Sequence, residues 1–97
     1  MAHDQGRLLP WVTGDGQPCF LVAENGQGYL SRVADDMERV QLGMAVELLG
    51  HADDMLGDYG ATAAQLRYLG RRMAESLRDV HRIAVSRGAR MADPVLD

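Results

Sequence analysis

Residues 42–70 read LGMAVELLGHADDMLGDYGATAAQLRYLG, and this stretch decides the fold. Both of its ends carry apolar residues at helical spacing, and its middle places Gly57 and Gly60 in a short turn. Glycine commonly ends helices, whereas a threonine followed three residues later by glutamine, as in Thr62 and Gln65, begins them through reciprocal capping hydrogen bonds. The stretch therefore predicts two helices, which a short turn makes antiparallel neighbours.

The helical periodicity extends over residues 31–57 and 62–88, with Ser31 as the predicted N-cap of the first helix and Gly88 as the residue that ends the second. The second helix is expected to face the first through an apolar seam. The residues of this predicted seam are Leu66, Gly70, Met73, Leu77, Val80 and Ala84.

The first helix has more apolar surface than one neighbouring helix covers. Its apolar arc spans roughly 200°, against about 100° for a simple surface helix. We therefore expect a second copy of the chain to cover the excess, in a homodimer with a four-helix core. The residues expected in the dimer core are Met37, Val40, Met44, Leu48 and Met55.

Residues 8–30 have the pattern of short strands. Residues 11–13 and 19–23 are apolar runs of strand length, and the turn-forming residues 14–18 separate them. The predicted fold class is α+β, an N-terminal β-hairpin of two or three short strands followed by a long antiparallel helical hairpin. The hairpin is expected to pack on the helices because an isolated hairpin is marginally stable in water. The side chains expected to make that contact are Trp11, Phe20 and Val22.

A further turn signal, Asn25-Gly26, predicts Tyr29 and Leu30 as a short return strand. Asp93 and Pro94 block further helix near the C-terminus. We expect a disordered leader, one domain and a flexible tail. Their predicted bounds are 1–7, 8–90 and 91–97.

Composition limits the cellular setting. The chain has one cysteine, Cys19, which excludes an intrachain disulfide and fits a reducing compartment. It has no apolar run long enough to span a membrane and no signal-peptide stretch at its N-terminus. All ten basic residues are arginine, which fits a high-GC bacterial genome. We therefore expect a cytoplasmic bacterial protein without a membrane partner.

The two halves of the chain carry opposite charge. Residues 1–60 hold ten acids and three arginines, and residues 61–97 hold seven arginines and four acids, which gives −7 and +3 and accounts for the net −4. The simplest interpretation is pairing between the helices. The pairs expected from the turn position are Glu47 with Arg71 or Arg72, and Glu38 with Arg82. The alternative is an arginine face that follows phosphates.

The sequence contains no phosphate loop, zinc cysteine pairs or nucleophile elbow. His51 and His81 with Glu47 form the alternative of a zinc site, but the repeated Glu-x-x-His pattern of helical metal sites is absent. We therefore expect no metal, no cofactor and no enzyme.

The predicted function is a small non-catalytic protein-interaction or regulatory module acting through its helical hairpin. The alternative is a nucleic-acid-binding regulator that uses the arginine-rich second helix. Gly43 and Gly50 recur at a heptad interval on the first helix, where small residues let another backbone approach closely. The expected partner-binding residues are Gly43, Glu47, Gly50, Asp54, Arg67, Arg71, Arg78 and Arg82.

Overall fold

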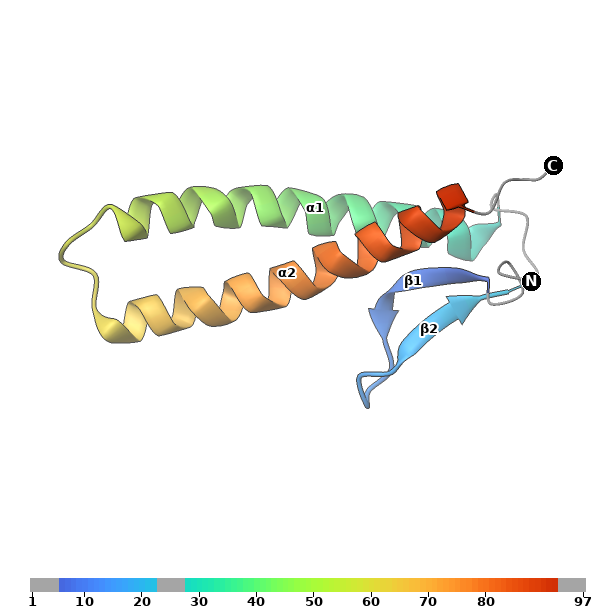
Figure 1. The fold of residues 1–97 in the computed structure, drawn as a ribbon, viewed down its shortest axis with the longest axis horizontal. Coiled ribbons are helices and arrows are strands. Elements are labelled where there is room, and N and C mark those ends of the chain that lie inside the picture. Colours follow the sequence, from blue (N-terminus) through green and yellow to red (C-terminus); the bar gives the residue numbers. More distant parts are fainter. Residues whose placement is uncertain (1–5, 23–27, 93–97) are drawn as a thin grey trace.

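The computed structural model describes residues 6–22 and 28–92. The chain forms strands β1 (Arg7–Val12) and β2 (Pro18–Leu21), then helices α1 (Tyr29–Leu56) and α2 (Ala63–Ala92) (Figure 1). The two helices run antiparallel and form a hairpin, and the molecule measures 56 × 27 × 23 Å. The predicted α+β order of a strand hairpin and a helical hairpin is confirmed. The four-helix core concerns a second chain and stays a prediction. Neither of the described helices is long and apolar enough to cross a membrane.

The two strands pair antiparallel, with Leu8 opposite Phe20 and an irregularity before Val12. The turn between them is closed by Thr13, whose backbone N–H donates to the carbonyl of Gln17 at 2.9 Å and whose hydroxyl accepts from the Gln17 N–H at 3.0 Å. Gly16 has a φ of 82°, a left-handed conformation that glycine adopts without strain. The turn predicted at residues 14–18 is therefore confirmed.

The start of α1 differs from its prediction. Tyr29 and Leu30 belong to the first turn of the helix, so the predicted return strand is wrong. The N-cap is Gly28, and Ser31 is a buried residue inside the helix rather than its cap. The Asn25-Gly26 turn signal lies outside the described residues.

The start of α2 is as predicted, but its end is not. Thr62 and Gln65 form the capping box, with the Thr62 N–H donating to the Gln65 side chain at 2.8 Å and the Gln65 N–H donating to the Thr62 hydroxyl at 3.1 Å. Gly88 does not end the helix, which continues to Ala92. An exposed glycine lowers the stability of a helix by about 1 kcal/mol. The helix still continues when the residues on either side of the glycine favour a helical backbone.

The two helices meet through small, polar and aliphatic side chains. Ala34 and Ala52 are buried on α1, and Ile83 and Ser86 are buried on α2. These positions recur at three- and four-residue spacing, so each helix turns one stripe toward the other. We call these stripes the contact seam. Its residues are Ala34, Glu38, Gln41, Ala45, Leu48, Ala52 and Met55 on α1, and Leu69, Arg72, Ser76, Asp79, Ile83 and Ser86 on α2.

The predicted seam of α2 is wrong. Leu66 and Leu77 are 41% and 68% exposed, and Gly70 has nothing within 4 Å of the position that a Cβ would take. The stripe that faces α1 lies about 100° away around the helix, one position earlier in the sequence. The alanines of α1 let the helix axes approach along that stripe. Leu66, Met73 and Leu77 of α2 are therefore left outside.

The strand hairpin lies against the C-terminal half of α2 and the beginning of α1, with β1 between the helices and β2 (Figure 1). Leu9 and Pro10 are buried there and Trp11 is half-buried, whereas Phe20 and Val22 are about half exposed. The hairpin therefore buries Leu9 and Pro10 more than the side chains predicted to pack on the helices. Hydrogen bonds fix β1 to both helices. Ser86 donates to the Leu8 carbonyl at 2.8 Å, and Gln41 donates to the Pro10 carbonyl at 2.9 Å.

A buried carboxylate joins the three elements. Glu38 is 1% exposed, and its oxygens lie 3.3 Å from Arg7 of β1, 3.2 Å from Arg87 and 3.9 Å from Arg90 of α2. Arg7 also pairs with Asp35 at 2.6 Å. Arg7 is thus the first residue of β1 and holds the hairpin to α1, although the sequence placed it in the leader.

Arg90 completes this cluster by also donating to the Ser86 hydroxyl. Burial lowers the pKa of Arg90 from its usual value, and the charge of Arg7 lowers it further, while Glu38 acts in the opposite direction. An arginine stays protonated despite such a shift. The cluster therefore remains an ionic connection between the hairpin and the helices.

Candidate functional site

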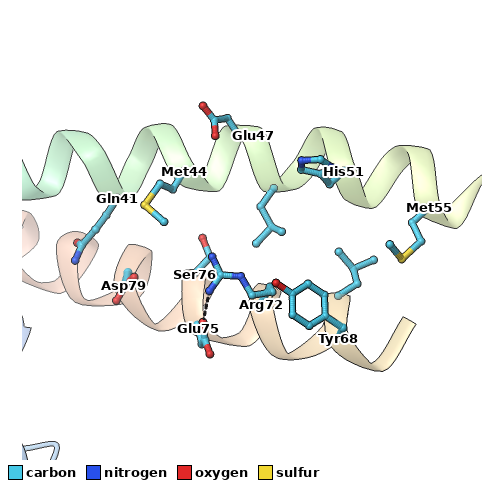
Figure 2. Close-up of a pocket in the computed structure, with 12 residues that line it drawn as sticks. Gln41, Met44, Glu47, His51, Met55, Tyr68, Arg72, Glu75, Ser76 and Asp79 are labelled. Atoms are coloured by element: carbon cyan, nitrogen blue, oxygen red, sulfur yellow. Dashed lines mark hydrogen bonds and ion pairs between the residues drawn. The ribbon is translucent and has the colours of Figure 1, made fainter. Parts of the chain in front are cut away.

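A groove of about 460 Å³ opens between α1 and α2 beyond the strand hairpin (Figure 2). Its apolar lining comes from Met44, Leu48, Met55 and Leu69, which are contact-seam residues or their immediate predecessors. Because the alanines of the seam are small, the larger side chains on this side of the helices do not fill the space. The groove extends along α1 from Gln41 to Met55, which is about 21 Å at the helical rise.

Polar side chains form the rim of the groove. Arg72 pairs with Glu75 at 2.6 Å, as the dashed line in Figure 2 marks. Tyr68 lies beside Arg72 on α2, and His51 lies on α1. Glu47 points away from α2 in the same view. The arrangement suits binding of an apolar segment with a polar flank.

The side of the helical hairpin opposite the groove is also apolar. In antiparallel helices, the positions just before the seam on both helices share one side, and the positions just after it share the other. The groove residues Met44, His51, Tyr68 and Glu75 precede seam positions. The residues that follow seam positions therefore lie together on the opposite side, which we call the apolar face. Its apolar and small residues are Leu42, Val46, Leu49 and Leu56 on α1, and Leu66, Gly70, Met73, Leu77, Val80 and Ala84 on α2. The charged residues Asp35, Arg39, Asp53 and Arg87 also follow seam positions and lie on the same side.

Much of this apolar face is exposed in the single chain. Val46 is 69% exposed, Leu49 57% and Leu77 68%. These are large fractions for aliphatic side chains that are clustered rather than scattered. The strand hairpin meets this side of the helices at the start of α1, since Asp35, which follows the seam residue Ala34, pairs with Arg7 of β1 at 2.6 Å.

The predicted partner-binding residues fall on two separate edges. Asp36, Gly43, Glu47, Gly50 and Asp54 lie on the side of α1 that points away from α2, which we call the acidic edge. Arg32 and Arg39 lie on the same side, and Arg39 pairs with Asp36 at 2.7 Å.

By the same helical geometry, Arg71 and Arg78 precede seam residues and lie toward the groove side of α2, with Arg67 next to them and farther from α1. We call this stripe the arginine edge. Its residues are Arg67, Arg71 and Arg78. The two edges lie on separate helices.

Arg82 is separate from the arginine edge, since it pairs with Asp79 at 3.2 Å and is half buried. The predicted pair of Glu38 with Arg82 is therefore wrong. Glu38 binds Arg87 instead, because α2 continues past Gly88 and presents later arginines at the height of Glu38.

Glu47 and Arg72 lie at matching positions along the two helices, as predicted, but they do not form the predicted ion pair. Glu47 and Arg72 line the same groove from opposite helices, but the guanidinium of Arg72 donates to Glu75. Among the residues that the structure describes, the arginine edge makes no ion pair. The interpretation of this stripe as pairing with α1 is thus not supported within one chain.

The five residues predicted for a dimer core are divided between two environments. Leu48 and Met55 are half buried in the contact seam. Met37, Val40 and Met44 are 40–56% exposed and lie on the groove side. Gly43 and Gly50 have nothing within 4 Å of a would-be Cβ, so contacts within the chain do not explain them.

In the described ranges 6–22 and 28–92, no three His, Cys, Asp or Glu side chains lie close enough together to hold a metal ion. Comparison with known protein families, with functionally described proteins and with solved structures gave no significant match.

Proposed function

We propose that this chain is a small, non-catalytic protein-interaction or regulatory module whose helical hairpin binds another protein. The observation that carries the proposal is the groove, which has an apolar lining that the chain itself does not fill. Two of its lining residues, Met44 and Met55, have flexible side chains that adapt to different apolar ligands. Such a groove between helices accepts an amphipathic helix.

The charge of the groove favours a basic partner. Glu75 and Asp79 are paired with arginines, but Glu47 adds a further negative charge at the rim. The chain as a whole carries a net charge of −4. The length of about 21 Å accommodates about four turns of a helix. The proposed partner segment is therefore a helix of about this length, with apolar anchors on one face and basic residues beside them.

A synthetic amphipathic helical peptide with leucine anchors and flanking lysines tests this proposal. We expect it to bind more tightly than the same peptide with glutamates in place of the lysines. Met44→Glu is expected to weaken binding at least about tenfold, since a charge is costly on the apolar lining. Val85→Glu is the matched control because Val85 is an exposed apolar residue outside the groove. Fluorescence anisotropy gives the affinities.

Equal binding by wild type and Met44→Glu, or no binding of either peptide, would contradict the proposal. If the peptides behave as expected, a photo-crosslinking residue at position 44 then identifies the natural partner in host extract, with position 85 as the control.

The second candidate function is nucleic-acid binding through the arginine edge. It is favoured by one observation, which is that Arg67, Arg71 and Arg78 are exposed and form no ion pair in the described part of the chain. Spaced guanidinium groups on a helix are suited to phosphate contacts.

Under this second candidate, Arg71→Gln with Arg78→Gln abolishes binding to duplex DNA or to single-stranded RNA with little loss of stability. Titrations at several salt concentrations check it, because phosphate contacts weaken steeply with salt. Absence of salt-sensitive binding by the wild-type chain would reject the candidate.

A further inference from the structure

We infer that the groove binds a partner helix with two unlike flanks, basic where it faces α1 and acidic where it faces α2, and that this charge pattern fixes the direction of the bound helix. The inference deepens the proposed function and rests on it. It adds the chemistry of the second flank and the orientation of the partner segment.

The charged residues along the two margins of the groove are sorted by helix. Four exposed charged residues each directly precede a residue that lines the groove, so they lie along its margins. The two on α1 are acids and the two on α2 are arginines. They are Glu47 and Asp54 on α1, and Arg71 and Arg78 on α2. The α1 margin is therefore negative and the α2 margin positive, on the two sides of the groove that Figure 2 shows.

The charges of the margins have no partner within the described part of the chain. None of the four side chains makes an ion pair there. The acids and the arginine that line the groove from α2 do pair, Arg72 with Glu75 at 2.6 Å and Asp79 with Arg82 at 3.2 Å. Each of these two pairs is neutral as a unit. The charge that a ligand meets is therefore that of the two margins.

A helix that places its apolar anchors on the groove lining has one flank beside each margin. Opposite charges across an interface favour association, whereas like charges placed side by side oppose it. Glu47 and Asp54 thus favour lysine or arginine on the flank toward α1. Arg71 and Arg78 favour aspartate or glutamate on the flank toward α2. A helix with basic residues on both flanks would bring one of them against the arginines.

The handedness of the α-helix converts this pattern into a direction. Residues directly before the anchors lie on one flank of a helix, and residues directly after them lie on the other. On α1, whose seam faces α2, the positions before the seam turn toward the groove. By the same handedness, a bound helix parallel to α1 turns the positions before its anchors toward α2 and those after them toward α1. Reversal of the bound helix exchanges its two flanks.

Three synthetic peptides with the same leucine anchors test the flank pattern. The first has lysines after the anchors and glutamates before them, the second exchanges these residues, and the third has lysines on both flanks. The first and second are each expected to bind at least about fivefold more tightly than the third, because the third places lysines beside Arg71 and Arg78. This order is expected even though the chain carries a net charge of −4. Fluorescence anisotropy gives the affinities.

Reversing the charge of the α2 margin is expected to reverse the order. In the variant Arg71→Glu with Arg78→Glu both margins are acidic, so the third peptide becomes the tightest ligand. The matched control is Arg39→Glu with Arg67→Glu, which changes the net charge equally. Arg39 follows a seam residue and lies on the side opposite the groove, and Arg67 lies farther from α1 than Arg71 and Arg78. The control is expected to keep the order of the wild type.

The direction is measured with a photoreactive group on the N-terminus of each peptide. The first peptide, parallel to α1, is expected to attach at the end of the groove near Gln41. The second, which binds reversed, is expected to attach at the end near Met55. Mass spectrometry of the digested adducts locates the attachment.

Three results would overturn the inference and leave the proposed function standing. These are equal or tighter binding of the third peptide to the wild type, an order of affinities that the charge-reversed variant retains, and attachment of the first two peptides at the same end. Absence of binding by all three peptides would reject the proposed function and this inference together. A solution mass that falls from two chains to one when the first peptide is added would assign the groove to a second copy of the chain. Displacement of the peptide by duplex DNA would assign the arginines to phosphate contacts.

Discussion

Replacing Glu38 by glutamine is expected to lower the free energy of unfolding by about 3–5 kcal/mol. The Glu38 carboxylate is 1% exposed and receives hydrogen bonds from Arg7 and Arg87, while Arg90 lies at 3.9 Å. Glutamine keeps the shape of the side chain but removes its charge. Three guanidinium groups then remain close together with only the exposed Asp35 to offset them, and the hairpin loses its ionic connection to α2.

Urea unfolding at a fixed protein concentration measures this effect, because the stability of a self-associating chain depends on concentration. Asp35→Asn is the matched control. Asp35 pairs with the same Arg7 at 2.6 Å, but its side chain is 53% exposed. Exposed pairs contribute about 0–1 kcal/mol, so the control is expected to be nearly neutral. Equal losses in the two variants would contradict the assignment of Glu38 as the centre of the cluster.

Replacing Ala34 by leucine is expected to destabilise the chain by about 1–3 kcal/mol. Ala34 is fully buried in the contact seam, where small side chains let the two helices approach. A leucine there forces the helices apart or the hairpin away from them, because a closely packed site has no space for three additional carbon atoms.

The same substitution at Ala64 is the control for the helix propensity of leucine, since Ala64 is exposed near the start of α2. It is expected to change stability by less than about 0.5 kcal/mol. Urea unfolding again gives the difference. A neutral Ala34→Leu would mean that the helices do not meet through the small side chains of the seam.

The positions of the helices could be predicted from local signals. The capping box at Thr62 and Gln65 and the glycine at 57 fix the turn, and both are properties of a few neighbouring residues. The end of α2 could not be predicted from Gly88, because a glycine ends a helix only when the residues after it adopt a non-helical backbone. Residues 89–92 stay helical and bring Arg90 to the buried Glu38.

The face on which the helices meet could not be predicted from hydrophobicity. The most apolar stripe of α2 contains Leu66 and Leu77, but the chain buries the neighbouring stripe of Leu69 and Ile83. Either of two adjacent stripes of α2 could pack against α1. The alanines of α1 permit a close approach of the helices, and this favours the stripe of Leu69 and Ile83. The signal available in the sequence was the series Ala34, Ala45 and Ala52 on α1, which marks a close-packed stripe.

The cluster around Glu38 was also not predictable by pairing residues across the turn. Its members come from β1, α1 and α2, and Arg7 is 31 residues from Glu38 in sequence. An arginine at the first position of a strand carries no local signal of such a contact. A glutamate at a spacing shared with the alanines of α1 was the available indication that this acid is buried.

The solution mass of the wild-type chain tests the central claim most directly, which is that each helix buries one stripe against the other and leaves exposed apolar side chains for a second copy. Light scattering at a low and a high protein concentration, each in low and high salt, makes the measurement. The account predicts twice the chain mass of 10.6 kDa under all four conditions, because apolar burial holds the dimer when salt screens the charged edges. A mass of one chain at the high concentration would contradict it.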